Sequence, residues 1–325
     1  MAVVAAANLK PTAPTSSAPL SMLGSVVDSL LTRISKTRLP RRGAEILPTF
    51  RVKTAVGAVR VYDSGSTKPC IVFVPDGPNV IEHYQVLIGL LAQHLRVVCF
   101  DMPGFGFSFP QSSYRHSLME GANAVLGVLD GLGIKTATLA FSCANGFYAL
   151  ETARIAPERV ARLVLAQTPS LPAMHAWTYR NIPRPLRMPV IGQVAAWLFR
   201  RQAAHAWYGR ALPRTTDAQF FRHTAHGALS SGGCFCLAGV VQGLMREQAA
   251  PMTDIEVPCT IVWGTRDISH RDTDPDSLRM YLPQVEIIRF EDCGHFPDIE
   301  QPERYASIVK ERIARPGSRS RSFTR

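Results

Sequence analysis

From residue 49 onward, short apolar segments alternate with segments of helical periodicity. Residues 50–56 and 59–63 flank a glycine and predict a β-hairpin. Continuous apolar runs follow, separated by helical patterns, at residues 70–74, 96–101, 136–141 and 160–167. Strands that are apolar on both faces and alternate with helices are typical of a mostly parallel sheet covered by helices on both faces. The sequence therefore predicts an α/β fold.

The alternation stops between residues 170 and 250. This stretch has helical patterns, many aromatic residues and several prolines, but no strand-like alternation. The strand pattern then resumes at 259–263 and 285–290, and a last helix is predicted at 302–314. We therefore predict an α/β core made of residues 49–169 and 251–314, with a helical cap, residues 170–250, inserted after the sixth strand.

The two ends of the chain have a different composition. Residues 1–20 and 315–325 are rich in small, polar or basic residues and predict disordered tails. Residues 21–48 predict an amphipathic helix and a linker. The helix has an apolar stripe opposite Asp28, Thr32 and Arg33, and the stripe consists of Met22, Leu23, Val26, Val27, Leu30, Leu31 and Ile34. We expect this stripe to pack on the core; a partner or a membrane surface remains an alternative, because basic residues follow it.

Charge and cysteine usage narrow the function classes. The formal net charge is +11, but much of the excess lies on the two ends and in the cap, which argues against nucleic-acid binding. No apolar run approaches the roughly 20 residues that span a bilayer, and no secretory signal pattern is found. The seven cysteines form no closely spaced framework, so we predict a cytoplasmic protein. Cys234 and Cys236 are a weak metal motif without a second pair and are interpreted as packing residues.

Several segments of residues 49–314 resemble the α/β-hydrolase family, in its capped branch of epoxide hydrolases, dehalogenases and esterases. They are the glycine-rich turn after residue 101, the strand-to-helix turn at 139–146, Gly264–Asp267 and Gly294-His295. The resemblance implies a catalytic triad in the chain order nucleophile, acid, histidine, with no cofactor and no metal. Dehalogenase and epoxide-hydrolase chemistry needs a carboxylate nucleophile, and none stands at the turn.

Two adjacent residues compete for the role of nucleophile. The family usually has Gly-x-Ser-x-Gly here, and the small residues Ala140 and Ala144 would favour Ser142. An alignment without gaps to the family sequences on both sides instead places Cys143 at the nucleophile position. We predict Cys143 and keep Ser142 as the alternative. A helix N-terminus and a nearby imidazole both stabilise a thiolate, so we expect the thiol pKa of Cys143 below its free value of about 8.5.

The resemblance also implies the base and the acid. His295 follows the last predicted strand and precedes the last helix, as the family histidine does. Asp267 matches the acid of the family's Gly-x-x-Asp, which holds the imidazole tautomer. Some relatives carry the acid after the preceding strand, but Gln167 and Thr168 stand there.

The oxyanion hole departs from the family pattern. The N–H of Ala144 is one expected donor, and a loop that usually reads His-Gly-x supplies the second. Here that loop reads Asp76-Gly77-Pro78, and proline has no N–H. Either Asn79, Asn145 or a water replaces the missing donor, or the hole is incomplete. The expected oxyanion and substrate contacts are Ala144, Asp76, Gly77, Pro78, Asn79, Asn145 and, from the cap, Trp177.

We therefore predict a cysteine-dependent hydrolase of an activated ester, thioester or lactone, with a covalent acyl-Cys143 intermediate. An acyltransferase, cyclase or lyase with the same triad is the first alternative, and a non-catalytic ligand-binding protein is the second. The substrate is expected to be a small, largely apolar acyl compound. The cap has nine arginines against Asp217 and Glu247, so an anionic or carrier-linked substrate is expected, unless the charge only attracts the cap to the core.

Overall fold

The computed structural model describes residues 18–36, 47–248, 252–253 and 255–315. Its main sheet has nine strands; eight follow the order β1-β2-β4-β3-β7-β8-β10-β11, and β6 (Phe109–Pro110) pairs with β2. In this order, each strand from β4 through to β11 is parallel to the next one. Strand β2 is antiparallel to both of its neighbours, β1 and β4. The path strands are β1 (Thr49–Thr54), β2 (Gly57–Asp63), β3 (Cys70–Val74), β4 (Arg96–Phe100), β7 (Ala137–Phe141), β8 (Val160–Ala166), β10 (Cys259–Gly264) and β11 (Glu286–Phe290). The predicted mostly parallel sheet and the predicted hairpin are confirmed.

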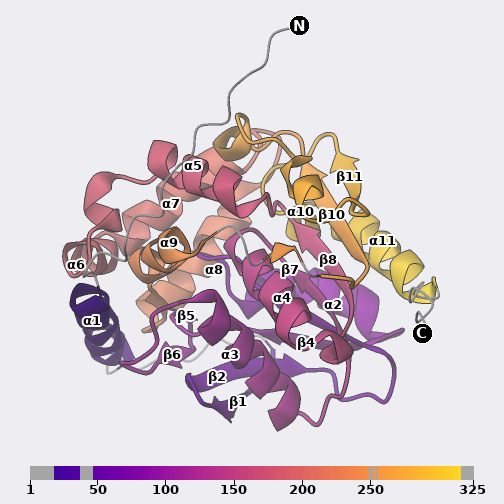
Figure 1. Ribbon diagram of the computed structural model, residues 1–325, viewed down its shortest axis with the longest axis horizontal. Helices are drawn as coiled ribbons and strands as arrows, with labels where there is room; N and C mark the ends of the chain where they lie inside the picture. The colour runs from indigo at the N-terminus through magenta and orange to yellow at the C-terminus, as the bar shows by residue number, and fades with distance from the viewer. Residues whose placement is uncertain (1–17, 37–46, 249–251, 254, 316–325) are drawn as a thin grey trace, which may run out of the picture.

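Helices cover both faces of this sheet (Figure 1). Helices α3 (Leu118–Gly131) and α4 (Ala144–Ile155) pack on one face, while α2 (Gln85–Ala92) and α11 (Pro302–Ala314) pack on the other. Alternate residues of β3 show why both faces are apolar: Val72 and Val74 join the first core, and Ile71 and Phe73 join the second. The segment between β10 and β11 includes a 3₁₀ turn, Ser277–Met280.

The cap lies between β8 and β10, which is after the sixth long strand, as predicted. Its helices are α5 (Leu171–Asn181), α6 (Ile191–Leu198), α7 (Arg200–Ala211), α8 (Ala218–Ser230) and α9 (Leu237–Arg246). The two-residue strand β9 (Cys234–Phe235) was not predicted, because two residues carry no alternation. It pairs with β5 (Phe105–Gly106) and so joins the cap to the core.

Helix α1 (Ala18–Lys36) is present, but its orientation is opposite to the prediction. The helix buries its polar face, which consists of Ser21, Ser25, Asp28, Ser29, Thr32 and Ser35. Most of the apolar stripe faces outward, and the Leu30 side chain is 56% exposed, whereas Val27 and Leu31 are half-buried. Hydrogen bonds account for this docking, because Ser25 Oγ donates to the Ser112 carbonyl (2.7 Å) and the Trp197 indole N–H donates to Ser35 Oγ (3.0 Å).

The start of α1 also differs from the prediction. The helix begins at Ala18, so residues 18–20 belong to it rather than to the tail predicted for residues 1–20. Residues 1–17 lie outside the described residues, as do the basic residues 38, 41 and 42 and the tail from residue 316. In the described part of the chain, no helix has both the length and the apolar character needed to cross a membrane.

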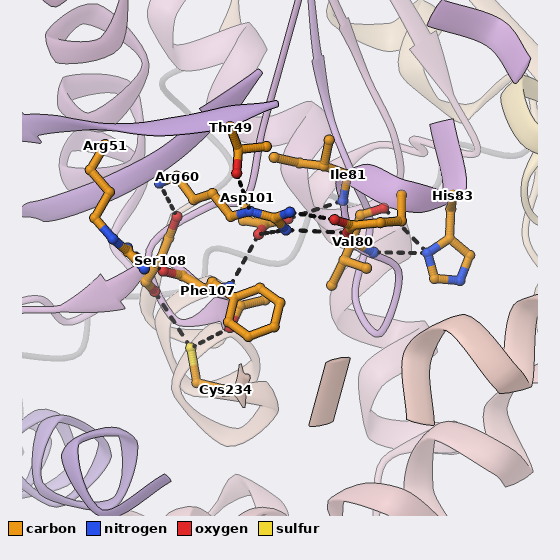
Figure 2. Close-up of polar contacts among 12 residues, drawn as sticks. Thr49, Arg51, Arg60, Val80, Ile81, His83, Asp101, Phe107, Ser108 and Cys234 are labelled. Carbon is orange, nitrogen blue, oxygen red and sulfur yellow. Dashed lines mark hydrogen bonds and ion pairs between the residues drawn. The ribbon is translucent and has the colours of Figure 1, made fainter. Parts of the chain in front are cut away.

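A buried ionic network holds the loops beside the carboxyl end of β3 (Figure 2). Arg60, 1% exposed, forms ion pairs with Glu82 and Asp101. Asp101 in turn accepts backbone N–H groups from Ile81 (3.2 Å) and Phe107 (3.1 Å). One guanidinium therefore fixes both the 3₁₀ turn Ile81–Tyr84 and the glycine-rich turn after β4.

Replacing Arg60 with methionine is expected to destabilise the protein by about 3–5 kcal/mol, because it leaves two buried carboxylates without a counter-charge. Urea unfolding at neutral pH measures the change. Arg96→Met is the matched control, since its partner Asp63 is less buried and would remain in contact with water. Equal losses in the two variants would contradict the role assigned to burial.

Candidate active site

Cys143 occupies the strand-to-helix turn between β7 and α4. Its backbone has φ 49° and ψ −120°, a conformation that costs a non-glycine residue energy and is concentrated at functional sites. Its own N–H donates to the Ala166 carbonyl (2.7 Å), which ties the turn to β8. The thiol thus stands at the N-terminus of α4, where the helix dipole and the N–H of Ala144 favour a negative charge.

Ser142 takes part in a different network. Its hydroxyl donates to Asp298 Oδ2 (2.8 Å), and the Tyr84 hydroxyl donates to the same oxygen (2.6 Å). Among the described residues, no hydrogen bond joins Ser142 to His295. The arrangement favours Cys143 over Ser142 as the candidate nucleophile.

His295 and Asp267 come together as the resemblance implied. His295 Nδ1 lies 2.6 Å from Asp267 Oδ2. Asp267 also accepts the Gln167 side-chain amide (2.9 Å) and the Ser269 N–H (2.8 Å), so its carboxylate is held from several sides. Burial alone would raise the pKa of Asp267, but His295, followed by His270 and Ser269, lowers it to about 2. Gln167 stands where some relatives carry the acid. Here its side chain instead donates a hydrogen bond to Asp267 and holds that carboxylate in place.

A second carboxylate faces the other side of the same ring. Asp76 Oδ2 lies 3.3 Å from His295 Nε2, and the two side chains are almost fully buried. Burial opposes the charged imidazolium, but the charge of Asp267, that of Cys143 when it is ionised, and the contact with Asp76 raise the pKa of His295 well above its usual value. Burial also raises the pKa of Asp76. Asp76 and His295 are thus close enough for each to change the charge state of the other.

The expectation of a lowered thiol pKa is wrong for this closed site. Burial, and next the Asp76 carboxylate, raise the pKa of Cys143 to about 11. His295 and the Ala144 N–H act in the opposite direction but do not outweigh them. The sequence argument counted the helix and the histidine and left out a neighbouring carboxylate. Cys143 is therefore a neutral thiol at rest and needs a base.

The structure restricts the second oxyanion donor. The N–H of Asn145 donates to the Ser142 carbonyl (3.0 Å) and its side-chain amide donates to the Pro75 carbonyl (3.0 Å), so its backbone donor is engaged and its side chain has one N–H left. The N–H of Asn79 is also engaged, by the Asp76 carbonyl (2.9 Å). The side-chain nitrogen of Asn79 is buried without a partner among the described residues.

Gly77 and Pro78 shape the loop rather than donate to it. A Cβ on Gly77 would lie 2.5 Å from the Phe105 ring, so only glycine fits there. The Gly77–Pro78 peptide is cis, and Pro78 offers no N–H. The N–H of Ala144, which contacts the Cys143 thiol, stays the first expected donor.

Sequence reasoning missed His270 and Trp207. The His270 ring stacks on His295 (centroids 5.3 Å apart), and the Trp207 ring meets His295 edge-on (5.0 Å). Trp177, predicted to contact substrate, stacks on the far side of His270 (5.0 Å) and donates its N–H to the Ser269 carbonyl (2.7 Å). The sequence feature that could have indicated His270 as a site residue is its position three residues after the predicted acid, Asp267.

Three side chains of the site offer ligands for a metal ion. A sulfur or nitrogen atom of Cys143, His270 and His295 lies within 4.8 Å of each of the others. A thiolate and two imidazoles suit a transition metal such as zinc. An ion bound there would occupy the sulfur atom that the triad would use as nucleophile.

Comparisons with known proteins agree with this architecture. The sequence model described as "Alpha/beta hydrolase family" matches residues 71–308. The chain is 26% identical to 2-hydroxymuconate semialdehyde hydrolase of Pseudomonas sp. strain CF600, over 78% of the chain and 89% of that protein. It is 25% identical to pimeloyl-[acyl-carrier protein] methyl ester esterase of Nitrosospira multiformis, over 68% of the chain and 85% of that protein.

A solved structure shows the same fold at lower identity. Epoxide hydrolase A from Mycobacterium thermoresistibile superposes with a TM-score of 0.70 at 14% identity, covering 83% of this chain and 99% of that one. The relatives and neighbours are α/β-hydrolase-fold hydrolases, which confirms the predicted enzyme class. With a family match over most of its length, the chain belongs to the alpha/beta hydrolase family.

Proposed function

We propose that the protein hydrolyses an activated ester, thioester or lactone through a covalent acyl-Cys143 intermediate. The observation that carries the proposal is the strained turn that holds Cys143 at the N-terminus of α4, beside a histidine fixed by Asp267 at 2.6 Å. A nucleophile, a base within reach and a group that orients the base form the arrangement of covalent acyl transfer.

In this reaction, His295 Nε2 takes the thiol proton as the Cys143 sulfur bonds to the substrate carbonyl carbon. The carbonyl oxygen becomes an oxyanion, stabilised by the Ala144 N–H. The intermediate collapses, the bond to the leaving group breaks, and the imidazolium gives its proton to the departing oxygen or sulfur. Water, deprotonated by His295, then attacks the thioester carbonyl, and the acid product leaves as the thiol is reprotonated.

In this proposal, the carboxyl group of Asp76 supplies the second hydrogen-bond donor of the oxyanion hole. When the proton that it shares with His295 resides on Asp76, the imidazole is free to act as base and the carboxyl group has an O–H to donate. A carboxylic acid kept neutral by burial has this role in other active sites. When the proton resides on His295 instead, the base is blocked and the carboxylate repels an oxyanion. The balance between the two forms would govern the rate.

The same carboxylate supports a second candidate function, acyl transfer, cyclisation or a lyase reaction with the same triad. An incomplete oxyanion hole can cost about 10²–10³ in rate, which an activated donor tolerates better than a simple ester. Asp76, 3.3 Å from the base, could then move a proton to or from a second substrate group.

The cap supports the substrate class. Its nine arginines against two acidic residues fit an anionic or carrier-linked acyl group, and one relative is named for a carrier-linked methyl ester. The Trp177 and Trp207 rings around the two histidines fit an apolar acyl chain. All seven cysteines are free thiols, which fits the cytoplasm that we propose as the site of the reaction.

A stopped-flow experiment with chromogenic aryl esters and thioesters tests the proposal. We expect a burst of one leaving group per enzyme, followed by slower turnover to the acid, because acylation and deacylation are separate steps. Product analysis with an added amine or alcohol separates the two candidates. Acid as the main product supports hydrolysis, and ester or amide products support transfer. Absence of both burst and turnover over a broad ester panel would contradict both.

A further inference from the structure

A second cluster of chemically active side chains lies away from the active site. It combines Asp28 of α1, His116 of the loop before α3, and Cys236 at the start of α9. One ligand atom of each side chain lies within 4.8 Å of the other two, and each residue is at most 5% exposed. The cluster therefore joins the N-terminal helix, the core and the cap at one buried point.

Three polar atoms of this cluster lack a hydrogen-bond partner among the described residues, although Asp28 is also in hydrogen-bond contact with Cys236 and Gln193. Asp28 Oδ2 and both ring nitrogens of His116 form no hydrogen bond among the described residues. Burying such groups without a partner is unfavourable, because each has lost its hydrogen bonds to water. His116 also has φ 58°, an unfavourable backbone for a non-glycine residue. The fold thus holds an imidazole and a carboxylate close together without letting them satisfy each other.

The surroundings leave room for these atoms. A Cβ on Gly239 would lie 2.7 Å from both Asp28 Oδ2 and His116 Nε2, and a Cβ on Gly104 would lie 2.7 Å from the His116 ring. A cavity of about 10 Å³, the space of about one water molecule, borders Asp28 and Cys236. From the sequence, Cys234 and Cys236 are interpreted as packing residues, because no second cysteine pair follows them. The neighbours of Cys236 in this cluster, Asp28 and His116, come instead from distant segments of the chain.

We propose that Asp28, His116 and Cys236 bind a divalent transition-metal ion, zinc by the chemistry of the ligands. Sulfur, imidazole nitrogen and carboxylate oxygen are the donors that zinc prefers, and a tetrahedral ion holds its ligands roughly 3.3–3.8 Å apart. The three ligand atoms lie within 4.8 Å of one another, so binding requires them to move closer together. A water in the adjacent cavity, or the Cys234 sulfur beside Cys236, completes the coordination. Binding releases the thiol proton of Cys236, and the ion then joins α1 to the core and the cap.

Metal content and cobalt spectroscopy test this site. The full-length protein is expected to retain one equivalent of zinc after dialysis, and Co²⁺ substitution is expected to give a thiolate-to-cobalt charge-transfer band. Cys236→Ser and Asp28→Asn, both close in shape to the native residues, are expected to lose the ion and the band. Chelation should lower the melting temperature of the wild type and leave that of Cys236→Ser unchanged.

Cys143→Ser is the matched control, because the active site also offers a cysteine and two histidines. It is expected to keep the zinc and the cobalt band. Loss of both in Cys143→Ser with retention in Cys236→Ser would assign the ion to the active site and overturn the proposal. Absence of bound metal and of a cobalt band in the wild type would also overturn it, whatever the variants do.

A different observation supports an inference about the opposite face of α1. Its outward side chains are Leu20, Met22, Leu23, Val26, Leu30 and Ile34, each more than 40% exposed. Helix α6 packs beside α1 (Figure 1) and exposes Ile191, Val194 and Leu198. Single exposed apolar residues are ordinary, but a row of them along one helix marks an interaction surface. Two basic residues, Arg33 and Lys36, lie in the last turn of α1 at the end of this apolar row. The neighbouring cap also carries an excess of basic residues.

We infer that this face binds an anionic phospholipid surface, where apolar side chains enter the interface and basic ones meet the headgroups. The protein is expected to sediment with vesicles that contain phosphatidylglycerol, and Val26→Glu with Leu30→Glu is expected to abolish this. Pure phosphatidylcholine vesicles and high salt should weaken binding. No sedimentation, or a dimer that the same double variant dissociates, would overturn the inference.

Discussion

Cys143→Ala is expected to abolish turnover of an activated ester, with a loss of about four to six orders of magnitude in kcat. The reason is that the variant lacks the atom that forms the acyl-enzyme, while His295 and Asp267 remain in place. Cys143→Ser should retain the geometry but lose most of the rate. A hydroxyl depends more on base assistance and on a complete oxyanion hole, and the proposed hole has one backbone donor, the Ala144 N–H. Steady-state kinetics on a chromogenic substrate measure both losses.

Ser142→Ala is the control for this series. Its hydroxyl bonds Asp298 and not His295, so a small effect on kcat is expected, together with some loss of stability. Loss of activity in Ser142→Ala with tolerance of Cys143→Ala would make the enzyme a serine hydrolase. Full activity in both Cys143→Ala and His295→Ala would mean that turnover does not use the triad.

Asp76→Asn is expected to raise kcat/KM for ester hydrolysis at neutral pH by about tenfold to a hundredfold. The change removes a negative charge beside the developing oxyanion and supplies an N–H₂ donor in its place. It also frees His295 from the ion pair that blocks the base. Since Asp76 adds to the pKa of Cys143, alkylation of the thiol by iodoacetamide should be faster in the variant.

The pH dependence of kcat/KM is expected to differ between the wild type and Asp76→Asn. Activity rises as His295 loses its proton, and Asp76 raises the pKa of His295, so the rising limb should move to lower pH in Asp76→Asn. The wild type should lose activity again at higher pH, as ionised Asp76 comes to repel the oxyanion, and the variant should not. Asp267→Asn is the control with the opposite expected effect, a loss of about 10⁴ in kcat. A comparable loss in Asp76→Asn would instead make Asp76 an essential proton carrier and favour the transfer or lyase function.

Elements with strong local signals were predictable from the sequence. The strands at 70–74 and 160–167 are apolar on both faces and had no other stable place than the middle of a parallel sheet. Cys143, His295 and Asp267 each follow a strand, and the carboxyl ends of parallel strands meet at one edge. Their meeting therefore followed from the order of the elements.

Features that depend on partners far along the chain were not predictable. The polar face of α1 is buried because Ser25 and Ser35 find partners at Ser112 and Trp197, and periodicity cannot reveal those contacts. The raised pKa of Cys143 has the same origin, because it depends on burial under the cap and on a carboxylate from another loop.

The most direct test of a cysteine nucleophile is to identify the acylated residue. The enzyme is mixed with an activated thioester, quenched in acid during the burst, digested and analysed by tandem mass spectrometry that separates Ser142 from Cys143. We predict one acyl group, located on Cys143 and removed by neutral hydroxylamine as a thioester. An acyl group on Ser142, or a burst without any acylated peptide, would contradict the account.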